Sequence, residues 1–144
     1  MDKIVGDELL KNDACAPTVE LMANPQFVGI YFGAHWAPPC RRFTSTLKQI
    51  YEEINKDGVK FEVIFCSQDG DEKAFQRNFA DMPWAAVNYA EEQRRSTLQQ
   101  KFGIMAIPTL IILDKEGRII SYDGRQDLQQ FQSAVLDNWE KIKS

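Results

Sequence analysis

The sequence is poor in metal-binding side chains and has few cysteines. Its 144 residues contain one His and three Cys, and the cysteines, Cys15, Cys40 and Cys66, are widely spaced. This spacing fits neither a zinc motif nor the disulfide framework of a small secreted protein. We therefore expect no metal, and a compartment in which thiols stay reduced: the cytoplasm, with the nucleus as a further option.

The sequence also lacks a basic excess and a long apolar run. Its 17 Lys and Arg residues are outnumbered by 21 Asp and Glu, which gives a formal net charge of −4. Binding to nucleic acid through phosphates needs a concentrated basic surface. The longest apolar stretches run to about six residues, against the roughly 20 that cross a bilayer, and residues 1–13 carry many charges. We expect no nucleic-acid partner, no membrane partner, no transmembrane span and no signal peptide.

Length and composition favour one hydrophobic core. A chain of this length with 44% apolar residues is too short for two comfortable cores. We therefore expect a single domain over residues 1–144. Residues 1–25 mix charges with prolines and show no sustained period, so they are interpreted as an N-terminal extension of uncertain structure.

Strands and helices alternate along the rest of the chain. Residues 27–32 and 61–66 are almost wholly apolar, which is typical of strands covered on both faces. The pattern further predicts three helices: one that follows the loop at 33–39 and ends near residue 57, one at 71–79 and one at 92–102. It also predicts strands at 109–113 and 118–122. A last helix should follow, whose inward-facing side chains are those of Leu128, Phe131, Val135, Trp139 and Ile142. This order predicts an α/β fold with a mixed sheet and helices on both faces.

The most informative stretch joins the first apolar strand to the helix that follows it. Residues 36–40 read Trp-Ala-Pro-Pro-Cys. Pro39 suits the first helical turn because its missing N–H would have had no partner there, so Cys40 should lie just inside the helix. Free amide groups and the helix dipole at such a position stabilise a thiolate. We expect Ala37, at the start of this turn, to be partly exposed.

The loop resembles the redox loop of the tryparedoxin and nucleoredoxin branch of the thioredoxin superfamily, which reads Trp-Cys-Pro-Pro-Cys. Residues 41–44 match the Arg-x-Phe-Thr stretch that follows it in this branch, and the Met-Pro-Trp of 82–84 and the Ile-Pro-Thr of 107–109 come in the same order. The resemblance covers about residues 27–113. It implies the thioredoxin fold and a thiol-disulfide oxidoreductase that acts by dithiol-disulfide exchange.

The resemblance also implies roles for individual residues. In this family the first cysteine attacks and the second resolves, which assigns attack to the position of Ala37 and resolution to Cys40. The proline of the Ile-Pro-Thr segment is cis in this superfamily and faces the redox loop. The substrate-binding residues that the resemblance implies are Trp36, Pro38, Pro39, Ile107 and Pro108.

Ala37 departs from the family pattern. An alanine has no nucleophile, so a dithiol-disulfide cycle cannot run in the chain as written. Either a working enzyme was altered at this position, or the natural protein lacks the thiol. The other features of the loop are kept, which favours the first explanation: a protein-disulfide reductase in its parent form, with this chain a nucleophile-knockout variant. The alternative is a redox-dead module that binds peptides in a groove between Trp36 and Pro108.

Partners follow from the same resemblance. It implies disulfide-containing protein substrates, such as peroxidases or oxidised regulatory proteins including transcription factors, together with an upstream thiol reductant. We expect no cofactor and a monomer. Tyr31 stands where thioredoxins proper carry a buried Asp, so the proton of the resolving thiol must pass to water or another group. We interpret His35 as a solvent-facing loop residue and Cys66 as a packed small hydrophobe.

Overall fold

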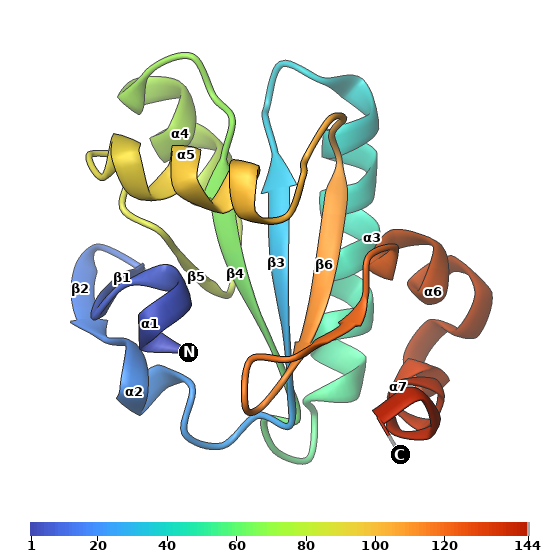
Figure 1. Cartoon of the computed structure of the whole chain (residues 1–144). Coiled ribbons are helices and arrows are strands. Elements are labelled where there is room, and N and C mark those ends of the chain that lie inside the picture. The colour runs from blue at the N-terminus through green and yellow to red at the C-terminus, as the bar shows by residue number, and fades with distance from the viewer. Residues whose placement is uncertain (144) are drawn as a thin grey trace.

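A computed structural model describes residues 1–143 and shows one seven-stranded sheet between two layers of helices (Figure 1). The strands are β1 (Glu8–Lys11), β2 (Ala14–Pro17), β3 (Phe27–Gly33), β4 (Phe61–Ser67), β5 (Ala85–Ala86), β6 (Thr109–Asp114) and β7 (Ile119–Ser121). The helices are α1 (Asp2–Val5), α2 (Thr18–Leu21), α3 (Pro38–Ile54), α4 (Glu72–Phe79), α5 (Glu92–Lys101), α6 (Gly124–Phe131) and α7 (Val135–Lys143), with a 3₁₀ turn, η1 (Gln132–Ala134). The strand order is β2-β1-β5-β4-β3-β6-β7.

The two apolar strands predicted from the sequence form the centre of the sheet. Every residue of β3 and β4 is buried, and the two strands run parallel. Strand β6 pairs antiparallel with β3 on its other side. Since successive side chains of a strand point to opposite faces, Tyr31 joins one apolar cluster, while Ile30 and Phe32 join the other.

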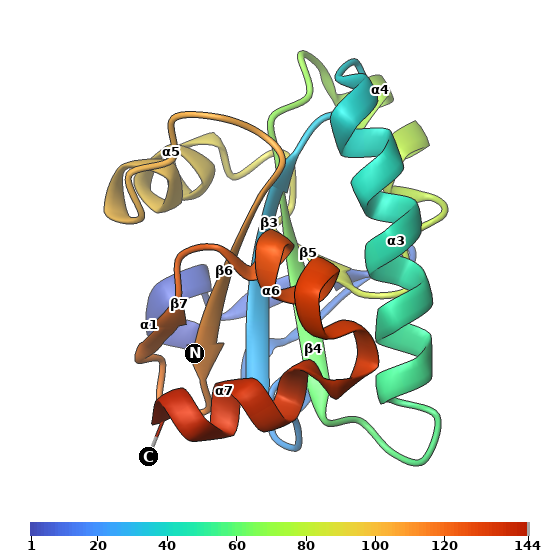
Figure 2. The same ribbon diagram turned by 90° about the vertical axis from the view of Figure 1, so that its right-hand side faces the viewer.

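Each face of the sheet is covered by its own helices. Figure 2 shows α3 against one face and α1 with α5 on the opposite side, while α6 and α7 lie near the β6–β7 edge. The cluster on the first face includes Leu47 of α3 and Phe75 of α4, and the cluster on the second includes Val5 of α1 and Leu98 of α5. The predicted mixed sheet with helices on both faces is therefore confirmed. Within residues 1–143 no helix is both long and apolar enough to span a bilayer.

The last helix is predicted wrongly as one continuous element. The chain turns at Gln132, whose φ of 52° ends α6, and a 3₁₀ turn leads into α7. Across this joint the indole Nε1 of Trp139 donates to Asp127 Oδ2 at 3.0 Å. Ile142, in the last turn of α7, is exposed instead of inward.

The first 25 residues, for which the sequence shows no clear pattern, contain two short helices and a hairpin. Strands β1 and β2 pair antiparallel and add to the sheet edge beyond β5. Between them Asn12 takes a φ of 56°, a left-handed conformation that Asn tolerates better than most residues. This hairpin extends the sheet on the side away from β6.

Candidate functional site

Three loops meet at the carboxyl ends of β3 and β4, at the top of Figure 1. They are the loop between β3 and α3, the loop between β4 and α4, and the segment that enters β6. Because Phe32 lies opposite Thr109 and Gly33 opposite Ser67, the Ile107-Pro108 bond falls beside the start of the first loop. That bond is cis, as the resemblance predicts. The structure thus brings the predicted site residues to one end of the sheet.

The start of α3 fixes the position of Cys40. Ala37 is the N-cap residue, with extended backbone angles, and Pro38 and Pro39 occupy the first helical positions. The amide of Cys40 donates to Ala37 O at 2.9 Å and that of Arg41 donates to the same oxygen at 3.2 Å. Cys40 therefore lies inside the first turn, as predicted.

The expectation that position 37 is partly exposed is wrong. Ala37 is only 6% exposed, because the loop turns inward there and its amide donates to Ala34 O. Free amide groups are also scarce at this helix start, since Pro38 and Pro39 have no N–H and the amide of Cys40 already has an acceptor. Stabilisation of a thiolate at position 37 would therefore depend on the helix dipole and nearby cations more than on unpaired amides.

The Cys40 thiol is held in its protonated form by burial. Cys40 is 2% exposed, and this burial raises the pKa of its thiol above the ordinary value. A backbone hydrogen bond with Ala34 and the charge of Arg125 lower this pKa, while the charge of Asp69 raises it. A buried thiol with a raised pKa suits a resolving group, which should stay protonated until a mixed disulfide is beside it.

Tyr31 positions the first turn of α3 and does not accept the proton of the Cys40 thiol. Its hydroxyl donates to Cys40 O at 3.1 Å and shares a hydrogen bond of 2.7 Å with Thr44 Oγ1. Burial raises the pKa of the Tyr31 phenol far above its ordinary value, against the opposing hydrogen bond with Thr44. The phenol stays neutral, so it ties β3 to α3 through hydrogen bonds.

Asp69 is the buried acid of the site. It is 4% exposed, and its Oδ1 accepts the amide of His35 at 2.8 Å. Its Oδ2 accepts from Ser67 Oγ at 2.6 Å and from Asn78 Nδ2 at 3.3 Å. Asp69 thus ties the loop before Cys40 to the end of β4. No role for Asp69 is predicted from the sequence, although a polar residue just beyond a wholly apolar central strand is a signal for such a site.

Arg125 is a second residue of the site that is not predicted from the sequence. It lies at the start of α6, its guanidinium carbon is 6.0 Å from the centroid of the Phe43 ring, and its charge lowers the pKa of Cys40. No local pattern marks it, because 85 residues separate Arg125 from Cys40. Its guanidinium is the cation whose charge favours the thiolate of Cys40.

The outer surface of the site is apolar on one side. Trp36 is 65% exposed, and its Nε1 donates to Gln68 O at 3.4 Å. Met105, just before the cis bond, is 95% exposed, while Pro108 is buried and Ile107 half-buried. His35 is exposed, as expected, and its carbonyl accepts from Arg41. These exposed apolar side chains are available to a partner.

The other two cysteines do not join the site. Cys66 is buried in β4, as predicted, and Cys15 is exposed on β2 at the far edge of the sheet. All three cysteines are free thiols. In residues 1–143 no three His, Cys, Asp or Glu side chains are grouped so that they could hold a metal ion.

Comparison with known proteins agrees with this geometry. A thioredoxin-like family model matches residues 24–119. The nucleoredoxin of Danio rerio is 41% identical over 137 residues, which are 95% of this chain and 32% of that protein. The chain therefore spans about a third of the length of this relative.

Solved structures extend the comparison to the whole fold. Native tryparedoxin I from Crithidia fasciculata is 34% identical, has a TM-score of 0.83, and is matched over 92% of each chain. A cysteine-to-alanine mutant of tryparedoxin-I is 33% identical, has a TM-score of 0.82, and is matched over 90% of each chain. The sheet and its helices are thus the thioredoxin fold.

Proposed function

This chain belongs to the thioredoxin-like family of oxidoreductases, and we propose that position 37 and Cys40 are the attacking and resolving positions of a protein-disulfide reductase. The observation that carries the proposal is the buried thiol of Cys40, held in the first turn of α3 directly after the N-cap residue 37. We also propose that Ala37 replaces the attacking cysteine of a parent enzyme, because the rest of the site is kept.

The parent cycle follows from thiol chemistry. A thiolate at position 37 attacks one sulfur of a substrate disulfide, that S–S bond breaks, and the departing sulfur takes a proton. Cys40 then gives up its proton and attacks the sulfur at position 37, which releases the second substrate thiol. The enzyme keeps a disulfide between position 37 and Cys40, and two electrons have passed to the substrate. An upstream thiol reductant returns the enzyme to its starting state.

The site residues have distinct tasks in this cycle. Trp36 and the prolines of the loop contact the substrate, and the backbone at Ile107 and Pro108 pairs with an extended substrate segment. The proton of Cys40 passes to water or to another group, since Tyr31 stays neutral. Arg125 favours the thiolate over the thiol by its charge.

The substrates we propose are disulfide-containing proteins, such as peroxidases or oxidised regulatory proteins including transcription factors. The proposed compartment is the cytoplasm, with the nucleus as a further option, because the odd number of widely spaced cysteines suits a reducing environment. A monomer that needs no cofactor is sufficient for this chemistry.

Trapping of a mixed disulfide tests the attacking position. In a Cys15→Ser background, which removes the exposed thiol, the Ala37→Cys/Cys40→Ser variant should form a stable adduct at position 37 with a disulfide-bonded peptide. Mass spectrometry of tryptic fragments locates the adduct. The matched control, Cys15→Ser with Ala37 and Cys40 unchanged, should form far less adduct, because it has no thiol at position 37. Equal adduct on both proteins would defeat the assignment.

The exposure of Trp36 favours a second candidate function. A side chain that is 65% exposed beside a buried cis-proline can hold an extended peptide without any redox step. In this account Ala37 is the native residue, and the chain is a peptide-binding module. Binding of reduced peptides by the chain as it stands, lost in a Trp36→Ala variant and unaffected by Cys40→Ser, would favour this candidate.

A further inference from the structure

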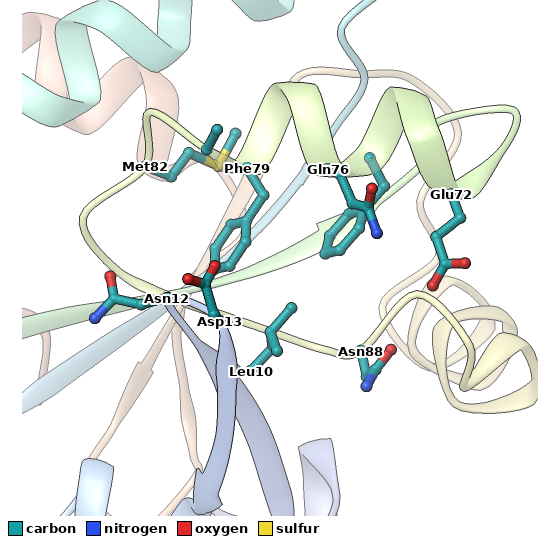
Figure 3. A pocket seen from close by; sticks show the side chains of 10 residues that line it. Leu10, Asn12, Asp13, Glu72, Gln76, Phe79, Met82 and Asn88 are labelled. Carbon is teal, nitrogen blue, oxygen red and sulfur yellow. The ribbon is translucent and has the colours of Figure 1, made fainter.

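A cavity lies between helix α4 and the β1–β2 hairpin (Figure 3). Its volume is about 570 Å³, within the range of ligand-binding pockets. None of the residues that line it belongs to the redox loop or to the turn before β6.

The cavity exists because the sheet separates at this edge. Strand β5 has only two residues, and β1 pairs with it at the single position Leu10–Ala86. Beyond that pair the hairpin continues to its turn at Asn12 without a neighbour in the sheet. Helix α4 covers β4 but does not reach the hairpin, which leaves the space between them open.

The floor of the cavity is apolar and rigid. Phe75, Phe79 and Met82 are buried side chains whose surfaces face the cavity, and Leu10 closes it from the hairpin. The rings of Phe75 and Phe79 stack with centroids 5.5 Å apart, and Phe75 also stacks on Tyr89 at 5.5 Å. A floor that is already ordered costs little conformational entropy when a ligand binds.

The rim of the cavity is acidic. Figure 3 shows the carboxylates of Asp13, on the hairpin turn, and of Glu72, at the start of α4, on opposite sides of the aromatic floor. The residues that line the cavity include no Lys, Arg or His. Lys11, the nearest basic residue on the hairpin, donates its Nζ to Pro83 O at 2.7 Å. The cavity therefore favours a cationic occupant.

Three amide side chains complete the rim. Gln76 and Asn88 line the cavity between the two carboxylates, and Asn12 lies next to Asp13 at the hairpin turn. An amide side chain can both donate and accept hydrogen bonds, which is what the backbone of an extended peptide requires. Two separated carboxylates, an apolar floor between them and amides beside it are complementary to a peptide segment.

We propose that this cavity docks a short segment of a partner protein, in which an apolar side chain is flanked on both sides by Lys or Arg. The apolar side chain packs on Phe75, Phe79 and Met82. The flanking cations pair with Asp13 and Glu72. The proposal is independent of redox chemistry, because no residue of the redox loop takes part.

A capped heptapeptide with a central Leu, one Arg on each side of it and Gly or Ser elsewhere is the probe. Titrated into the ¹⁵N-labelled chain, it should shift the amide signals of Leu10, Gln76 and Asn88 and leave those of the redox loop in place. Peptides with Glu in place of both Arg, or with Ser in place of Leu, should bind much more weakly. Raising the salt from about 50 mM to about 500 mM should weaken binding, since exposed charges are screened.

Charge-neutral variants give the decisive comparison. Each exposed ion pair contributes about 0.5 kcal/mol, so Asp13→Asn/Glu72→Gln should raise the Kd about 5-fold. The matched control, Glu20→Gln/Glu52→Gln, removes two exposed charges outside the cavity and should leave the Kd unchanged. Gln76→Trp, which places a large side chain at the rim, should abolish binding while the circular dichroism spectrum stays the same.

Three outcomes would overturn the proposal. The first is a set of shifts confined to residues outside the cavity. The second is equal binding of the Arg-flanked and Glu-flanked peptides. The third is binding of n-hexylammonium as tight as that of the peptide, which would identify a site for small amphipathic cations instead of a protein segment.

Discussion

Removal of one hydroxyl group tests how the first turn of α3 is held. In Tyr31→Phe the ring keeps its contacts with Phe43 and Phe65, whose centroids lie 5.5 and 5.4 Å away, so packing is conserved. Two hydrogen bonds disappear, one to Cys40 O and one shared with Thr44 Oγ1. At about 0.5–1.5 kcal/mol for each bond, the free energy of unfolding should fall by about 1–3 kcal/mol.

Urea denaturation measures this loss. With a urea m-value of about 2 kcal/mol/M, the midpoint should fall by roughly 0.5–1.5 M, and the m-value should stay the same because the surface exposed on unfolding does not change. Thr44→Val removes the other partner of the shared bond, and the double variant Tyr31→Phe/Thr44→Val should show a coupling energy of about 1 kcal/mol. A Tyr31→Phe protein within about 0.3 kcal/mol of the starting chain would refute the idea that the phenol holds this turn.

Three further predictions concern the same end of the sheet and its core. Gly33→Ala should destabilise the fold by about 1–3 kcal/mol, since its Cβ would lie 2.8 Å from the rigid Tyr31 ring; thermal unfolding checks this, and an unchanged Tm would contradict it. Asp69→Asn should lower the pKa of Cys40, because the charge of Asp69 raises it. The ¹³Cβ chemical shift of Cys40, followed against pH, measures this pKa, and an equal or higher pKa in the variant would count against the charge effect. Burial raises the pKa of Cys66 from 9.0 to about 12. Between these pH values the unfolded chain loses this proton while the folded chain keeps it, so the free energy of unfolding should fall by up to about 1.4 kcal/mol for each unit that the pH rises. Cys66→Ala should flatten that part of the stability–pH curve, and an equally steep fall in the variant would show that other groups cause it.

Local patterns predict the central elements well. Strands β3 and β4 are recognisable because both faces of each are buried, which leaves a continuous apolar run in the sequence. Helix α3 is recognisable because its buried residues recur at helical spacing after a proline start. The cis state of Pro108 follows only from the family resemblance, and nothing in the composition of the segment indicates it.

The parts that were missed depend on tertiary contacts. The helix predicted over the C-terminal residues has an unbroken apolar stripe, yet Gln132 interrupts it so that Trp139 can pack on Phe27 and Phe61. Arg125 reaches the site because α6 packs against β6 and α3, a tertiary contact that no local pattern indicates. The β1–β2 hairpin left one local signal, the Asn12-Asp13 pair at its turn, which an analysis of the turn residues could have used.

The central claim is that a single sulfur atom at position 37 separates this chain from a working disulfide reductase. The measurement is reduction of insulin disulfides in the presence of dithiothreitol by Ala37→Cys, beside the chain as it stands and Ala37→Ser as the matched hydroxyl variant. We predict turnover by Ala37→Cys alone, with a disulfide between position 37 and Cys40 in its oxidised form. An Ala37→Cys protein that folds with an unchanged circular dichroism spectrum, yet forms no such disulfide and reduces no insulin, would contradict the account and favour the peptide-binding function.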